Sequence, residues 1–213
     1  MATDDLASTL RARAEQHPDR TAFGFLDRKR DVTLTYGELD MQARRIASIL
    51  QNQVPPGGRA MLVHDQNLSF LTAFFGCLYA GIVAVPVCPP AAWRLEAGLA
   101  QVLGVLRDAR PHVVLAGGRT EWLAGVAAAR SGTAGPPWIE TDAPGDGDAT
   151  AWRDPGVRPS WPAFIQYTSG STSDPKGVVI RHADLLANQR SIDSFLRMGD
   201  DGIMVSWLPL YHD

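Results

Sequence analysis

Short apolar segments alternate with amphipathic helical patterns along most of this chain, and this alternation limits the folds it can adopt. Strands are expected at residues 59–64, 82–85, 112–116, 138–139, 163–167, 178–180 and 202–210. Helical stripes of apolar residues are expected within 35–50, 67–80, 95–106 and 122–127. Several of these strands are apolar at nearly every position, which is typical of parallel strands that are buried on both faces. The pattern predicts an α/β fold whose mostly parallel sheet layers are covered by helices.

Local signals predict where some of these elements begin and end. The run Thr35-Tyr36-Gly37-Glu38 has the spacing of a capping box, which starts a helix. Asn67 is suited to cap the next helix, and Gly81 is suited to end it in a left-handed conformation. Pro86 is expected to close the strand that follows.

Residues 66–93 carry no formal charge, and 68–87 are long enough to suggest a membrane span. Gly76, Gly81 and Pro86 interrupt that segment, and an uninterrupted spanning helix does not favour them. The segment is therefore predicted to be a buried helix followed by a buried strand, and no membrane span is expected.

Composition narrows the class of protein further. The chain is 45% hydrophobic and 20% charged, which excludes a disordered, collagen-like or coiled-coil protein. Its net charge of −3 provides no global positive field, so no nucleic-acid partner is expected. The N-terminus is acidic and lacks an apolar stretch, which argues against a signal peptide and favours the cytoplasm.

Two residue types that often form metal or disulfide sites lack the spacing for them. Cys77 and Cys88 lie in apolar surroundings and are expected to be free thiols. The histidines lack ligand spacing, so no protein metal site is expected. Arg44 and Arg45 are interpreted as a solvated helix face, and residues 28–30 as the tip of a hairpin.

Residues 164–180 are the segment most suggestive of chemistry. An apolar strand leads into a run of hydroxyl and glycine residues, then a lysine, then a second apolar strand. Small residues let a ligand approach the backbone, hydroxyls donate hydrogen bonds, and a lysine adds a mobile positive charge. Lys176 is one of only two lysines, the other being Lys29. The segment fits a polyphosphate, although a flexible hairpin turn is the alternative.

This segment differs from a P-loop in what surrounds its lysine. Pro175 precedes Lys176, Gly177 follows it, and the next residues are expected to form a strand. A P-loop instead has Gly-Lys-Ser/Thr and a helix immediately afterwards.

Residues 167–178 resemble the phosphate-binding signature of the adenylate-forming superfamily, which includes acyl-CoA synthetases, luciferases and nonribosomal peptide adenylation domains. Further similarity lies at residues 35–47, at 75–86 and in the strand expected after 182–186, so it extends over nearly the whole chain. Within the superfamily, residues 83–90, 165–168 and 206–213 resemble the fatty acyl-AMP ligases. Ser173 departs from the signature, because most members have glycine there.

The resemblance implies a two-step enzyme that uses ATP and Mg²⁺. A fatty acid attacks the α-phosphate, pyrophosphate leaves, and the acyl group passes from the adenylate to the phosphopantetheine of an acyl carrier protein, in polyketide, lipopeptide or lipid biosynthesis. His212 and Lys176 are the expected catalytic residues, with His212 beside the α-phosphate. A surface or hinge histidine is the alternative for His212. The expected phosphate-binding residues are Thr168, Ser169, Gly170, Ser171, Thr172, Lys176 and Gly177.

The domain prediction follows from the same resemblance. Residues 1–213 are expected to be the N-terminal portion of an AMP-binding domain, with 141–160 as a surface loop or mobile link. The rest of that domain and a C-terminal lid are expected to lie outside this chain, which is then inactive alone. An acyl-CoA synthetase, a nonribosomal adenylation domain, and a non-catalytic docking module of the same fold are the alternatives.

Overall fold

A computed structural model of the chain describes residues 5–26, 31–120, 122–131, 135–142, 147–168, 175–197, 199 and 202–211. Its helices are α1 (Leu6–Gln16), α2 (Tyr36–Gln53), α3 (Leu68–Ala80), α4 (Leu95–Ala109), α5 (Trp122–Ser131) and α6 (His182–Leu196). Its strands are β1 (Thr21–Phe25), β2 (Val32–Thr35), β3 (Arg59–Val63), β4 (Val83–Val87), β5 (Val113–Ala116), β6 (Trp138–Glu140), β7 (Pro162–Thr168) and β8 (Lys176–Arg181).

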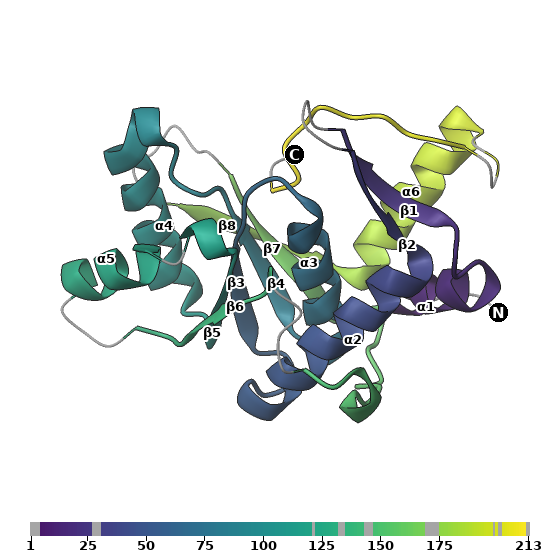
Figure 1. Cartoon of the computed structure of the whole chain (residues 1–213), viewed down its shortest axis with the longest axis horizontal. Coiled ribbons are helices and arrows are strands. Elements are labelled where there is room, and N and C mark those ends of the chain that lie inside the picture. The colour runs from purple at the N-terminus through teal and green to yellow at the C-terminus, as the bar shows by residue number, and fades with distance from the viewer. Residues whose placement is uncertain are drawn as a thin grey trace.

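The main sheet has six strands in the order β6-β5-β3-β4-β7-β8 (Figure 1). The strands from β6 to β7 pair in parallel, and β8 pairs antiparallel with β7 at the edge. A separate antiparallel hairpin is formed by β1 and β2. The predicted α/β class with a mostly parallel sheet is confirmed, and residues 28–30, expected at the tip of the small hairpin, lie outside the described residues.

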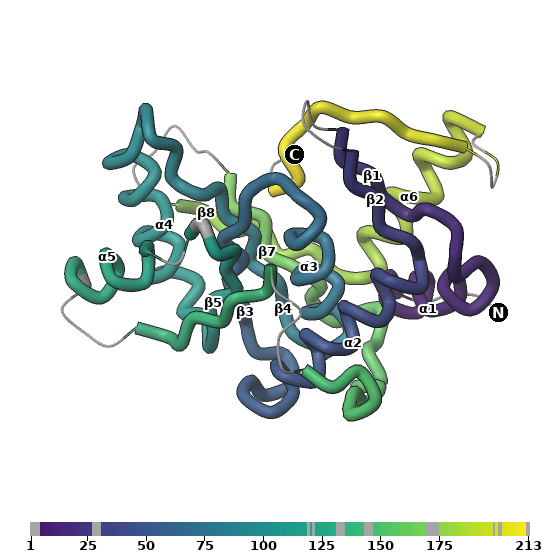
Figure 2. Tube along the Cα trace, viewed as in Figure 1, coloured from purple at the N-terminus to yellow at the C-terminus, as the bar shows by residue number. Residues whose placement is uncertain are grey.

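Alternate residues of the central strands face two different apolar cores. In β3, Ala60 and Leu62 pack with α2 and α3, whereas Met61 and Val63 pack with α4. Figure 2 shows α4 and α5 on one side of the sheet and α2 and α3 on the other. This burial on both faces explains why the strands are apolar at nearly every position.

The predicted helix ends are confirmed where the signal is local. Thr35 and Glu38 form the capping box of α2, and the Asn67 side chain accepts from the backbone N–H of Phe70 at the start of α3. Gly81 ends α3 with φ of +70°, a conformation that glycine adopts without strain.

Pro86 does not close its strand as predicted. It lies inside β4, opposite Leu62 in the parallel register with β3. Successive N–H groups of a strand point to opposite neighbours. Because Pro86 has no N–H, the sheet is weakened on one side of β4 only.

The predicted buried strand at residues 202–210 is wrong. These residues run from the end of α6 back toward the sheet without forming a strand (Figure 1). Ile203, Val205 and Trp207 are each more than three-quarters exposed. An apolar sequence becomes a strand only where another strand accepts its hydrogen bonds, and no strand in the described residues pairs with this one.

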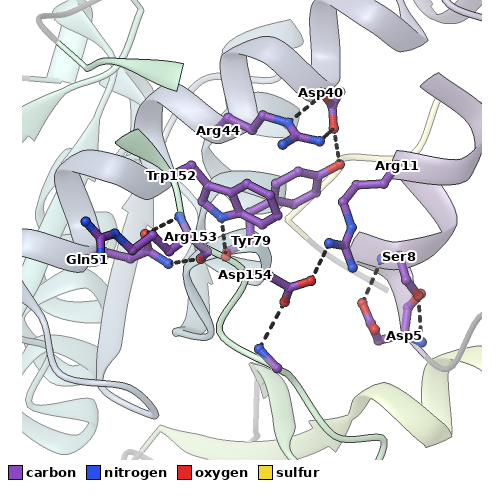
Figure 3. A network of polar contacts seen from close by, with 11 residues as sticks. Asp5, Ser8, Arg11, Asp40, Arg44, Gln51, Tyr79, Trp152, Arg153 and Asp154 are labelled. Carbon is purple, nitrogen blue, oxygen red and sulfur yellow. Dashed lines mark hydrogen bonds and ion pairs between the residues drawn. The ribbon is translucent and has the colours of Figure 1, made fainter. Parts of the chain in front are cut away.

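Arg44 is part of a packed polar network rather than a solvated face (Figure 3). It forms an ion pair with Asp40 and lies over the ring of Trp152, whose indole N–H donates to the Tyr79 carbonyl. Arg11 pairs with Asp154 in the same network. The described part of the 141–160 segment thus packs against α1, α2 and α3.

Candidate active site

The two strands predicted on either side of the hydroxyl-rich segment before Lys176 are present in the structure. Thr168 ends β7, Lys176 begins β8, and the two residues are partners in the antiparallel register. Both are exposed at the end of this hairpin. A strand follows the lysine, as the sequence predicts, so the unit differs from a P-loop. Ser169, Gly170, Ser171 and Thr172 lie outside the described residues.

Gly177 has a packing role that its sequence context did not reveal. A Cβ atom there would lie 2.6 Å from Ile165 Cγ2 and 3.1 Å from Tyr167 Cζ. Tyr167 is the register partner of Gly177, and its ring occupies the space that a side chain would need. Gly177 therefore permits close packing across the hairpin.

Asp108, which no sequence motif indicates, lies next to the hairpin. The Tyr167 hydroxyl donates a hydrogen bond to Oδ2 of Asp108, near the end of α4. Burial, followed by the nearby carboxylate of Asp108, raises the pKa of Tyr167 above its usual value. Asp108 is 59 residues away in sequence, so no local pattern could have identified this contact.

The last described residues return to the carboxyl end of the sheet. Gln166 on β7 donates to the Tyr211 carbonyl at 3.1 Å, and Gln66 donates to the Leu208 carbonyl at 3.1 Å. Tyr211 also lines a small pocket with Cys88 and Tyr167. Burial, and then contact with Cys88, raises the pKa of Tyr211 to about 12. This placement brings the backbone before residue 212 close to β7, but His212 itself lies outside the described residues.

The remaining predictions concern the two cysteines, metal sites and membrane spans. Cys77 and Cys88 are both free, as predicted, and burial raises the pKa of the Cys77 thiol. The described residues contain no group of three or more His, Cys, Asp or Glu side chains placed to hold a metal ion. Within the same residues, no helix is both long enough and apolar enough to span a membrane.

Comparison with known proteins relates this arrangement to enzymes. The medium-chain-fatty-acid–[acyl-carrier-protein] ligase JamA of Moorena producens is 36% identical over 212 residues, covering 98% of this chain and 36% of JamA. The long-chain-fatty-acid–AMP ligase FadD23 of Mycobacterium tuberculosis is 33% identical over 235 residues, covering 100% of this chain and 38% of FadD23. These relatives confirm the resemblance to fatty acyl-AMP ligases.

Solved structures agree with the sequence relatives. A fatty acyl-adenylate ligase from L. pneumophila, in complex with acyl adenylate and pyrophosphate, has a TM-score of 0.86 and 33% identity. The match covers 99% of this chain and 36% of that protein. A keto acid-selecting adenylation domain has a TM-score of 0.84, with 20% identity over 100% of this chain and 38% of its own, and shows the shared fold.

The chain spans little more than a third of the length of these relatives. The model of the AMP-binding enzyme family matches residues 10–213, which is almost all of it. This chain therefore belongs to the family of AMP-binding enzymes.

Proposed function

We propose that this chain is the N-terminal part of a fatty acyl-AMP ligase, which uses ATP to convert a fatty acid into an acyl-adenylate. The observation that carries the proposal is the β7–β8 hairpin. Thr168 and Lys176 lie opposite each other at its exposed end, and both belong to the segment that resembles the phosphate-binding signature. The names of JamA and FadD23 support a fatty acid as the substrate.

In this proposal the hairpin binds the leaving pyrophosphate of ATP. The hydroxyls of Ser169, Ser171 and Thr172, the backbone around Gly170 and the Lys176 ammonium donate to the β- and γ-phosphates. Charge that develops on these oxygens during attack is stabilised by such preorganised donors. His212 is assigned beside the α-phosphate and the fatty carboxylate, and the position of Tyr211 near β7 supports that assignment.

Mg²⁺ is proposed as the companion of ATP. Because the described residues form no cluster of metal ligands, they do not provide a protein cage for it. Mg²⁺ usually keeps several waters and binds through substrate phosphates, so we assign no step to a protein-held ion.

The acyl acceptor is proposed to be a carrier protein rather than free coenzyme A. The supporting observations are the resemblance at residues 83–90 and 206–213 and the name of JamA, an acyl-carrier-protein ligase. An acyl-CoA synthetase is the second candidate, because a relative named as a putative fatty-acid–CoA ligase is 34% identical over 227 residues.

We also propose that residues 1–213 alone form no acyl-adenylate. The chain corresponds to little more than a third of its relatives, and holding reactants in position contributes roughly 7–11 kcal/mol to such reactions.

The test uses the full natural protein that contains this chain, with residues 1–213 assayed beside it. Each is incubated with ATP and a fatty acid of about 12 to 16 carbons, whose burial contributes ~0.8 kcal/mol per methylene. Pyrophosphate release by the full protein alone is the expected result. Coenzyme A or a phosphopantetheinylated carrier protein is then added, and efficient acyl-CoA formation would favour the second candidate.

A further inference from the structure

The helix α4 contacts the β7–β8 hairpin at both ends of its connecting segment. Tyr167, just before the end of β7, donates its hydroxyl hydrogen bond to Asp108 on α4. Pro175, just before β8, packs against Gly104 on the same helix, where an added Cβ would lie 3.4 Å from Pro175 Cγ. Because Gly104 and Asp108 are four residues apart, one face of α4 makes both contacts.

The helix that makes these contacts is itself fixed to the sheet. Val102, Val105 and Ala109 are buried in the same apolar core as Val85 and Val87 of β4. Side chains in such a core are closely packed, so α4 cannot shift without disturbing the sheet. Because α4 is fixed in this way, it can hold the residues that it contacts, Tyr167 and Pro175, in place.

The ring of Tyr167 is held from its other side as well. Gly177 lies opposite it in the register, and a Cβ there would come within 3.3 Å of the Tyr167 hydroxyl oxygen. The ring thus lies between the β8 backbone and Asp108. A hydrogen bond to a carboxylate is stronger than one between neutral groups, so it can fix the orientation of the ring.

We propose that Asp108 is a positioning residue, which acts through Tyr167 to hold Thr168 and Lys176 in place for ATP. This inference rests on the proposed function, since Thr168 and Lys176 are assigned to the phosphates there. Asp108 makes no contact with substrate in this proposal. Its role is to fix the hairpin relative to the carboxyl end of the sheet.

The test compares Tyr167→Phe, Asp108→Ala and Asp108→Asn in the full natural protein. Misplacement by about 1 Å can lower a rate by about 100-fold, so we expect kcat/KM for ATP to fall 10- to 100-fold in Tyr167→Phe and Asp108→Ala. KM for the fatty acid is expected to stay unchanged. Asp108→Asn keeps an acceptor oxygen and is expected to restore most of the loss.

A second Tyr–Asp pair in the chain provides the matched control. The Tyr79 hydroxyl donates to Asp40 Oδ1 at 2.7 Å, joining α3 to α2. Tyr79→Phe removes the same group from a different part of the fold. It is expected to lower stability and leave KM for ATP unchanged, so general destabilisation can be separated from a positioning effect.

Coupling and hydrogen exchange complete the test. The double variant Tyr167→Phe/Asp108→Ala is expected to have a kcat/KM for ATP no lower than that of either single variant, because both single changes remove the same contact. Additive losses, no rescue by asparagine, or an equal rise in both KM values would overturn the proposal. Amides at residues 166–168 and 176–178 should exchange faster in Tyr167→Phe than in Tyr79→Phe. That measurement tests the contact even if the wild-type protein forms no acyl-adenylate, which would contradict the proposed function instead.

Discussion

The guanidinium carbon of Arg44 lies 4.4 Å from the centroid of the Trp152 ring. Arg44 belongs to α2, whereas Trp152 belongs to the segment between β6 and β7. The indole N–H of Trp152 donates to the Tyr79 carbonyl at 2.8 Å, and Arg11 also approaches the ring, at 5.4 Å. The indole therefore connects α1, α2 and α3 to a segment that has no sheet partner of its own.

Replacement of this tryptophan should destabilise the fold. We expect Trp152→Ala to lower the free energy of unfolding by about 2 to 4 kcal/mol, through lost packing and lost cation–π contacts. Urea-induced unfolding of the chain measures the change. Trp207→Ala is the control, because Trp207 is 87% exposed and its loss should cost no more than about 0.5 kcal/mol. Equal losses in both variants would contradict the assigned role of Trp152.

The helix ends and the contacts of Arg44 differ in how far the sequence predicts them. The Thr35–Glu38 capping box and the Gly81 helix end depend on neighbouring residues, so the sequence displays them directly. The surroundings of Arg44 depend on Trp152, which lies more than a hundred residues away. Charge pattern on one helix suggested a solvated face, because it carries no information about a distant aromatic ring.

His64 predicts how stability depends on pH. It follows β3, is 1% exposed, and its Nε2 lies 2.7 Å from Thr141 Oγ1, while Nδ1 has no hydrogen-bond partner among the described residues. Burial lowers the pKa of His64 to about 4, and the charges of Asp142 and Asp65 oppose this only in part. The unfolded chain therefore binds a proton more readily than the folded chain does.

The stabilisation from keeping His64 neutral is fully present above a pH of about 6.5 and is lost as the pH falls toward 4. Between pH 7 and pH 5 we expect a loss of about 2 kcal/mol from this group. His64→Gln should flatten the dependence of the unfolding free energy on pH in that range. His17→Gln, at an exposed position, is the control and should keep the wild-type slope. An unchanged slope in His64→Gln would exclude His64 as the source.

Gly177→Ala tests the packing of the hairpin. The new Cβ would meet Ile165 Cγ2 at 2.6 Å, so we expect a loss of about 1 to 3 kcal/mol from overpacking. Gly125→Ala is the matched control on α5, where no described atom lies within 4 Å of the added Cβ. It should instead stabilise the chain by roughly 0.5 to 1 kcal/mol. Denaturant midpoints that shift in the same direction for both variants would contradict the packing at Gly177.

The sequence suggests the chemistry proposed for the candidate site but not the contacts that hold its hairpin. Hydroxyl residues and a lysine between two apolar strands favour a phosphate site from composition and order, and that assignment stays a prediction. The hydrogen bond from Tyr167 to Asp108 depends on how α4 packs on the sheet, which the sequence does not display. The strand predicted at 202–210 fails for a related reason, since pairing needs a partner elsewhere in the chain.

Lys176 gives the most direct test of the phosphate assignment. It is exposed at the start of β8, opposite Thr168, so its ammonium group is available to a ligand at the end of the hairpin. In the full natural protein, Lys176→Ala should lower the rate of ATP–pyrophosphate exchange by about 10² to 10³, the usual effect of removing one donor to developing charge.

Lys29→Ala is the control for this prediction, because Lys29 is the only other lysine and is flanked by two arginines, more than a hundred residues before the signature in sequence. It should leave the exchange rate close to that of the wild type. Lys176→Arg keeps the positive charge but not the compact ammonium, so an intermediate rate is expected. Lys176 could act on charge that develops in the transition state or only attract ATP to the surface, and the kinetic parameter that changes distinguishes these two roles. A developing charge in the transition state requires a lower kcat, whereas a lysine that only attracts ATP to the surface would change KM alone and lose its effect at high ionic strength.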